Sequence, residues 1–121
     1  MVVVFAEDVF VNNWMGFYGW SGLDISMHLI GGFVTAWSAA RLYHLWNQKY
    51  EFIIKPALAV YAWFIAVTAF VGILWEVYEF LLDPYVAVAM QASVRDTVGD
   101  LVNDLVGAAV FCLVLYWRRN K

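Results

Sequence analysis

Three aspartates recur at four-residue intervals near the C-terminal end of the chain, at Asp96, Asp100 and Asp104. Side chains four residues apart lie one above another on a helix, so these carboxylates are expected to share one helical face. Beyond Asp104 the chain is apolar or small up to Trp117. A helix needs about 20 such residues to cross a bilayer core. The sequence therefore predicts a transmembrane helix with acidic chemistry at one end.

Two earlier apolar stretches also carry ionisable side chains at helical spacing. Asp24 and His28 are four residues apart, and Glu76 and Glu79 are three residues apart. If the three helices thread up, down and up, the start of the first, the end of the second and the start of the third occupy the same leaflet. Six carboxylates and one imidazole are then expected to gather in the outer half of the bundle.

The negative charge of such a cluster must be met by protons, by water at the outer mouth of the bundle or by a bound cation. A single aspartate at a helix centre costs ~2.5 to 3.5 kcal/mol to insert, and such residues normally pair or line a wet cavity. In the sequence Arg95 is the only cation near these acids. If a cation binds, carboxylates with one imidazole suit Mg²⁺, Mn²⁺, Ca²⁺ or Zn²⁺, so a divalent metal is the candidate cofactor. The candidate ligands are Asp24, His28, Glu76, Glu79, Asp96, Asp100 and Asp104.

Some of these residues have a second interpretation. Asp24 and Asp96 fall in first helical turns, where the macrodipole and free N–H groups favour a carboxylate, so both also fit as caps at a wet membrane surface. His28 fits equally as a hydrogen-bonded packing residue, although Asp24 shares its face. Asp100 and Asp104, like Glu76, lie further from the interface and are costly to bury without a purpose.

Composition sets the fold class. Of the 121 residues 64% are hydrophobic and 14% are charged, which is more apolar surface than a soluble core of this size can hide. The net charge of −3 and the lack of a large basic patch exclude a nucleic-acid partner. We predict an all-α, polytopic protein with one integral membrane domain over 1–121. It has an interfacial segment at 1–20 and three transmembrane helices at 23–45, 52–82 and 94–117.

Local signals place the boundaries of these segments. Residues 1–20 are too polar to span and are rich in aromatic residues, which favour the headgroup level. Residues 46–51 form a predicted polar turn, Pro56 suits an early helical turn, and the second helix is expected to end at Asp83-Pro84.

Small residues extend the polar faces of the predicted helices. Small side chains at steps of three and four let transmembrane helices approach closely, so the acidic faces are expected to pack together. These residues are Gly32, Ala36 and Ala40 in the first helix, Ala62, Ala66, Ala69 and Gly72 in the second, and Gly107 and Ala108 in the third.

Basic residues are distributed unequally between the two predicted sides of the membrane. One side holds only Arg95. The positive-inside rule predicts a multi-pass cell-membrane protein with its N-terminus outside and its C-terminus in the cytoplasm. The basic residues on the cytoplasmic side are Arg41, Lys49, Lys55, Arg118, Arg119 and Lys121.

Three local patterns also carry a family resemblance: DISMHLIGG from Asp24, GILWEVYEF from Gly72 and RDTVGDLVNDLVGA from Arg95. In this order, each on its own hydrophobic segment, they resemble the VanZ-like and YjdF-like group of small bacterial and archaeal integral membrane proteins. The resemblance runs from about Leu23 to the C-terminus. The name VanZ is tied to glycopeptide (teicoplanin) resistance, and the resemblance implies that the polar residues form one site.

Three classes of function follow. The first is a membrane-embedded metal or cation site that acts on a phosphate-bearing lipid or in cell-envelope maintenance, with Glu76 or His28 as the candidate base. The sequence shows no evident nucleophile, so enzymatic activity stays open. The second is a non-catalytic accessory subunit of a larger membrane complex, or a homo-oligomer, in contact with membrane lipids. The third, cation translocation, is disfavoured because the polar face stops at Asp104.

Overall fold

The structure is a computed structural model that describes residues 21–51, 53–85 and 93–121. These residues form three long α-helices and one short 3₁₀ turn, and no strand is found among them. The predicted all-α class holds for this part of the chain, and the predicted interfacial segment 1–20 lies outside it. The elements are α2 (Ser21–Tyr50), α3 (Ala57–Leu82), η2 (Asp83–Tyr85) and α4 (Val94–Arg119).

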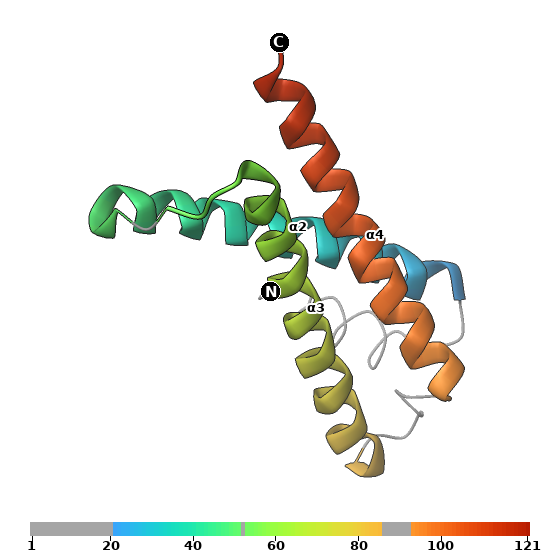
Figure 1. Ribbon diagram of the computed structural model, residues 1–121. Helices are drawn as coiled ribbons and strands as arrows, with labels where there is room; N and C mark the ends of the chain where they lie inside the picture. The colour runs from blue at the N-terminus through green and yellow to red at the C-terminus, as the bar shows by residue number, and fades with distance from the viewer. Residues whose placement is uncertain (1–20, 52, 86–92) are drawn as a thin grey trace.

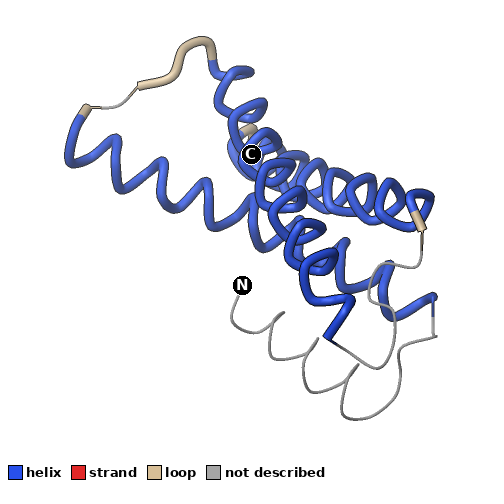
Figure 2. Tube along the Cα trace, turned by 90° about the horizontal axis from the view of Figure 1, so that it is seen from below, coloured by secondary structure: helices blue, strands red, loops and turns tan. Residues whose placement is uncertain are grey.

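The three helices form an open bundle in which α2 crosses the other two. Helices α3 and α4 lie side by side and run in opposite directions, while α2 passes across both (Figure 1). The start of α2, the end of α3 and the start of α4 lie at the same end of the molecule, and the view from below shows the same grouping (Figure 2). The threading therefore brings together the three helix ends that carry the ionisable residues.

Two of the helices have the length and apolar composition needed to cross a membrane. These candidate spans are Leu58–Tyr85, with 28 residues, and Val94–Arg119, with 26 residues. Helix α2 is longer, with 30 residues, but it is not among the candidate spans found in the described part of the chain. Its surface is mixed, because polar residues occupy both its first and its last turns. The predicted span at 23–45 thus stays a prediction.

The polar turn predicted at 46–51 is wrong for residues 46–50, which continue helix α2. The segment contains no glycine or proline that would stop a helix, and the side chains of His44 and Gln48 make a hydrogen bond of 3.0 Å across one turn. The helix ends at Tyr50 because Glu51 adopts a φ of 52°, the left-handed conformation that commonly terminates helices.

Helix α3 begins at Ala57 instead of at residue 52. Proline disfavours helical backbone in the residue before it, so the helix starts only after Pro56, whose own backbone is extended. Helix α4 begins at Val94, where the sequence predicts a helix to start. Its N-cap is Ser93, whose Oγ accepts a hydrogen bond of 3.2 Å from the backbone N–H of Asp96.

Of the four small residues predicted for the packed face of α3, only Gly72 is buried. Ala62 and Ala66 are exposed, and Ala69 is only half-buried. Residues at four-residue steps before Glu76 share its face of the helix. Ala62 and Ala66 lie two residues away from that series, so their side chains point to the opposite side. The buried residues of α3 are Val60, Phe64, Thr68, Gly72, Glu76 and Glu79.

Helices α2 and α4 make the tightest contact in the bundle. A Cβ on Gly32 would collide with the backbone carbonyl oxygen of Asp104, and a Cβ on Gly107 would collide with the carbonyl oxygen of Leu29. The two backbones therefore touch at these glycines, as the predicted close approach of small residues requires.

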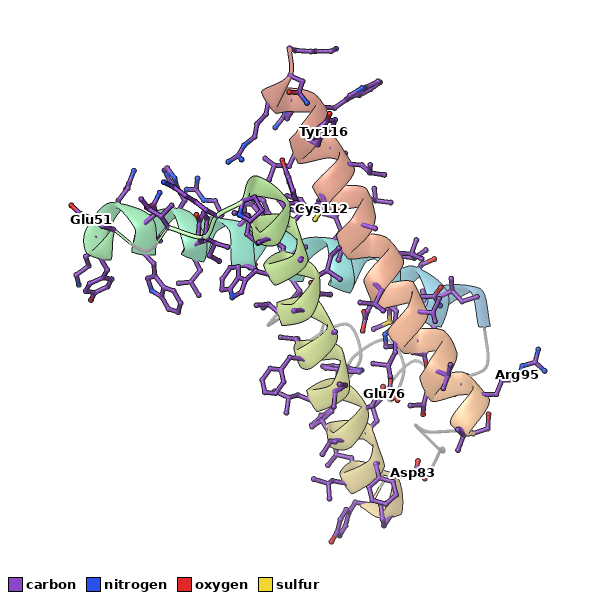
Figure 3. The ribbon with its side chains drawn as sticks, in the orientation of Figure 1. Glu51, Glu76, Asp83, Arg95, Cys112 and Tyr116 are labelled. Carbon is purple, nitrogen blue, oxygen red and sulfur yellow. The ribbon has the colours of Figure 1, made fainter. Side chains whose placement is uncertain are left out.

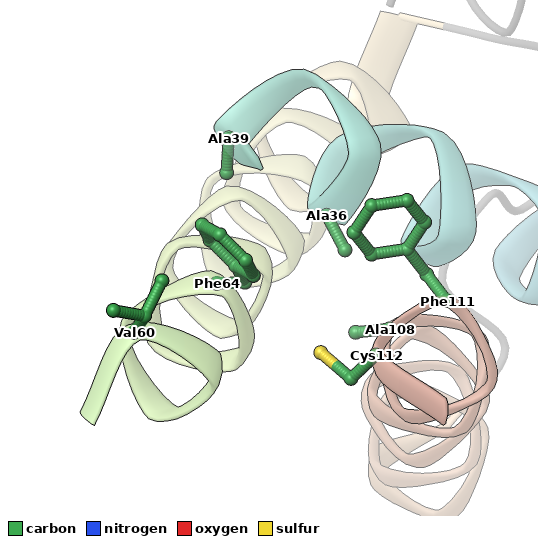
Figure 4. Packing of buried hydrophobic residues seen from close by; sticks show 7 residues of the cluster. All are labelled: Ala36, Ala39, Val60, Phe64, Ala108, Phe111 and Cys112. Atoms are coloured by element: carbon green, nitrogen blue, oxygen red, sulfur yellow. The ribbon is translucent and has the colours of Figure 1, made fainter. Parts of the chain in front are cut away.

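An apolar core fills the middle of the bundle between this contact and α3. The rings of Phe33 and Phe111 meet edge to face with centroids 5.4 Å apart, and Phe64 adds a third ring 6.3 Å from Phe111. Such edge-to-face pairs are favourable arrangements of aromatic rings. The fully packed members are Ala36, Ala39, Val60, Phe64, Ala108, Phe111 and Cys112 (Figure 4).

The glycine contact generates a stability prediction. We expect Gly32→Ala and Gly107→Ala each to lower the free energy of unfolding by about 1 to 3 kcal/mol, because backbone must move to admit the methyl group. The matched control is Gly99→Ala in α4, where the new Cβ meets nothing within 4 Å. Denaturation in detergent micelles measures the change. Equal effects of Gly32→Ala and Gly99→Ala would contradict the contact.

Candidate metal centre

His28 lies at the centre of a group of carboxylates contributed by α2 and α4. Its Nδ1 is 3.4 Å from Oδ1 of Asp104, and its Nε2 is 3.7 Å from Oδ1 of Asp24 and 3.9 Å from Oδ1 of Asp100. The side chains of His28 and Asp100 are 7% and 8% exposed, whereas that of Asp24 is 48% exposed. The imidazole is thus buried among three carboxylates, and Asp24 forms the wet edge of the group.

Asp104 is held in place by all three helices. Its backbone lies against Gly32 of α2, and its Oδ1 faces His28. On the other side, a Cβ on Gly72 of α3 would lie only 2.6 Å from Oδ2 of Asp104. The absence of side chains at Gly32 and Gly72 is therefore what makes room for this carboxylate beside the imidazole.

Three of these residues have the geometry of a metal site. Asp24, His28 and Asp100 each offer one ligand atom, and these atoms lie within 4.8 Å of one another. Protein ligands sit about 2.0 to 2.6 Å from Zn²⁺ or Ca²⁺, so ligands on opposite sides of one ion are roughly 4 to 5 Å apart. The spacing fits a single cation between the two helices with little rearrangement.

Two further carboxylates act on this group through space. Asp96 and Glu76 both lie within electrostatic reach of Asp100. Glu76 is buried on the side of α3 that faces α4 (Figure 3). Asp96 is half-buried in the first turn of α4, where its N–H is capped by Ser93. The position of Asp96 agrees with its alternative interpretation as a first-turn carboxylate.

Glu79 lies one turn further along α3 than Glu76. It is buried, and its Oε1 accepts a hydrogen bond of 2.9 Å from Nε1 of Trp75 in the same helix. Trp75 therefore positions the Glu79 carboxylate, although it is not itself ionisable. Its signal in the sequence is the four-residue spacing from Glu79, which places the two side chains on one face.

The structure thus sorts the seven predicted ligands into three groups. The first group is His28 with the three carboxylates around its imidazole, the second is two carboxylates within electrostatic reach of these, and the third is one glutamate that accepts a hydrogen bond within its own helix. These groups are, in order, Asp24, His28, Asp100 and Asp104; Asp96 and Glu76; and Glu79.

Comparison with known proteins places the chain in a family. The family model described as "Predicted membrane protein (DUF2238)" matches residues 2–121. The chain belongs to this family. No curated protein and no solved structure matches it. The DUF2238 family is described as a family of membrane proteins, and α3 and α4 are long and apolar enough to cross a membrane. The prediction that this chain belongs to a membrane protein family is therefore confirmed.

The centre of the DUF2238 protein has a defined chemical capacity. Carboxylate oxygens and an imidazole nitrogen can hold a hard or borderline divalent cation. A cation held there can polarise a phosphoryl or carbonyl oxygen, and Asp24 on the wet edge leaves a side from which such a group can approach. Asp104 does not belong to the three-ligand set, but it orients the imidazole as carboxylate partners of metal-bound histidines do.

Proposed function

We propose that this protein is a multi-pass membrane protein that binds a divalent cation at the centre formed by Asp24, His28 and Asp100. The observation that carries the proposal is the spacing of their ligand atoms, all within 4.8 Å. Two further carboxylates support the site. Asp104 contacts the Nδ1 side of the His28 imidazole, and the charge of Glu76 acts on Asp100 through space.

Charge balance favours a cation at this position. Between described residues, the ion pairs of the centre all involve His28. One imidazolium can offset at most one negative charge, whereas three carboxyl groups adjoin it, and Arg95 points outward from the start of α4 (Figure 3). Buried carboxylates in excess of their partners are costly, and a divalent cation removes that cost. The donor set suits Mg²⁺, Mn²⁺, Ca²⁺ or Zn²⁺.

The setting of the centre favours a role in cell-envelope or lipid-phosphate processes. It lies where two membrane-length helices meet α2, so a lipid that enters sideways between helices can bring its phosphate to the metal. His28 or Glu76 is the candidate base if a reaction takes place there. The three motifs that resemble the VanZ-like and YjdF-like group support the same assignment to the envelope.

A second candidate function is that of an accessory subunit in a larger membrane complex or a homo-oligomer. The outward faces of α3 and α4 present large apolar side chains, among them Phe70, Phe80 and Leu113, which are 61%, 63% and 67% exposed. In a membrane such faces contact lipid or another helix. Intact partners that co-purify in mild detergent, together with a metal-free centre, would favour this second function.

The metal proposal predicts a defined metal content. After loading with each candidate cation and removal of excess, the purified protein is expected to retain about one ion per chain by elemental analysis, since the three ligands form one site. His28→Gln and Asp100→Asn are each expected to abolish retention. The matched control is Asp83→Asn, which removes a carboxylate outside the centre. Retention that is absent in the wild type, or unchanged in His28→Gln, would refute the proposal.

We also propose that the cation centre faces the outside and the C-terminus the cytoplasm. The support is the excess of Arg and Lys at the ends of α2 and α4 that lie opposite the centre.

Labelling of introduced cysteines tests this orientation. In a Cys112→Ser background, we expect Tyr85→Cys to react with a membrane-impermeant thiol reagent added to intact cells. Asn120→Cys is expected to react only after the cells are opened. Both positions are exposed, so access to the reagent depends on sidedness alone. The reverse pattern would show the opposite orientation.

A further inference from the structure

A cavity of about 310 Å³ lies at the end of the bundle opposite the metal centre. It is bounded by the second half of α2, the last turns of α4 and one residue of α3. Arg118 on its rim is fourteen residues beyond Asp104 in α4, or roughly 21 Å at ~1.5 Å per residue. The cavity is therefore separate from the metal centre, and nothing argued for it depends on a bound cation.

The cavity has an apolar floor and a basic rim. Phe64 and Phe111, which are 2% and 6% exposed, form the floor, and the guanidinium-bearing side chains of Arg41, Arg118 and Arg119 line the rim. The arginines come from two helices, α2 and α4, that only the fold brings together. An amphiphilic ligand, with an anionic head and an apolar body, matches this arrangement.

The positive charge on the rim is not neutralised from within. No acidic residue lines the cavity, and no described residue forms an ion pair with the three arginines. Like charges that converge on one concave surface create a potential that attracts anions. Arginine forks also match the geometry of phosphate oxygens, with which they form paired, charge-assisted hydrogen bonds.

We propose that this cavity binds the phosphate headgroup of an anionic membrane lipid. Arg118 and Arg119 lie at the end of a membrane-length helix, where headgroups lie, and Arg41 of α2 lines the same cavity. The aromatic floor can cover the glycerol and the first methylenes of the lipid. A volume of about 310 Å³ is at the small end of ligand sites and suits a headgroup better than a whole lipid.

Native mass spectrometry of the full chain in detergent tests the proposal, with phosphatidylglycerol and phosphatidylcholine as probes. We expect the wild type to retain phosphatidylglycerol in preference to phosphatidylcholine. The double variant Arg41→Gln/Arg118→Gln is expected to weaken phosphatidylglycerol binding on the order of tenfold, because it removes two of the three guanidinium groups. Ala40→Leu, which narrows the cavity without a change of charge, is expected to lower retention as well.

Two controls test whether lipid binding depends on the cavity arginines or on positive charge anywhere on the protein. Arg95→Gln removes a cation at the far end of α4, and Lys49→Gln removes one at the same end of the bundle but outside the cavity lining. Both are expected to bind as the wild type does. Equal retention of the two lipids, an equal loss in Lys49→Gln, or inorganic phosphate bound as tightly as the lipid would each overturn the proposal.

Discussion

The contact between the α2 and α4 backbones at Gly32 and Gly107 is the constraint on which the rest of the structure depends. Because neither position carries a side chain, the Asp104 backbone rests on α2 and its carboxylate lies beside the imidazole of His28. Gly72 then lets α3 close over the other carboxylate oxygen. A packing device that is common among membrane helices here also sets the position of an ionisable residue. The geometry of the centre and the stability of the bundle are therefore linked.

Charge is arranged in opposite ways at the two ends of the bundle, with an aromatic core between them. Acidic residues meet at the end where α3 stops and α4 starts, whereas three arginines line the rim of a cavity at the other end. The core around Phe64 and Phe111 separates these regions and carries no ionisable side chain other than the thiol of Cys112 among its fully packed members. This separation argues against a continuous polar path through the described residues and favours two independent binding sites, one for a cation and one for an anion.

Periodicity and threading were sufficient to predict much of this arrangement. The four-residue spacings of Asp24 with His28 and of Asp100 with Asp104 fix a shared face within each helix, and the order of the helices fixes which ends meet. Which residues of each helix are buried in the bundle could not be predicted from the sequence alone. The face of α3 was predicted from small residues, yet Phe64 and Thr68 are buried on it, because they lie at the four-residue steps that lead back from Gly72 and Glu76. Nor does the spacing of α2 reveal that its helix continues to Tyr50, since polar residues end a span without ending a helix.

In the proposed centre, a cation binds directly to the imidazole of His28 between α2 and α4. Pulsed electron paramagnetic resonance of the protein loaded with Mn²⁺ tests it, because an imidazole nitrogen bound to the ion modulates the electron spin echo. We predict ¹⁴N modulation in the wild type and its loss in His28→Gln, with His44→Gln unchanged. Bound Mn²⁺ without nitrogen modulation, or modulation that survives in His28→Gln, would contradict the account.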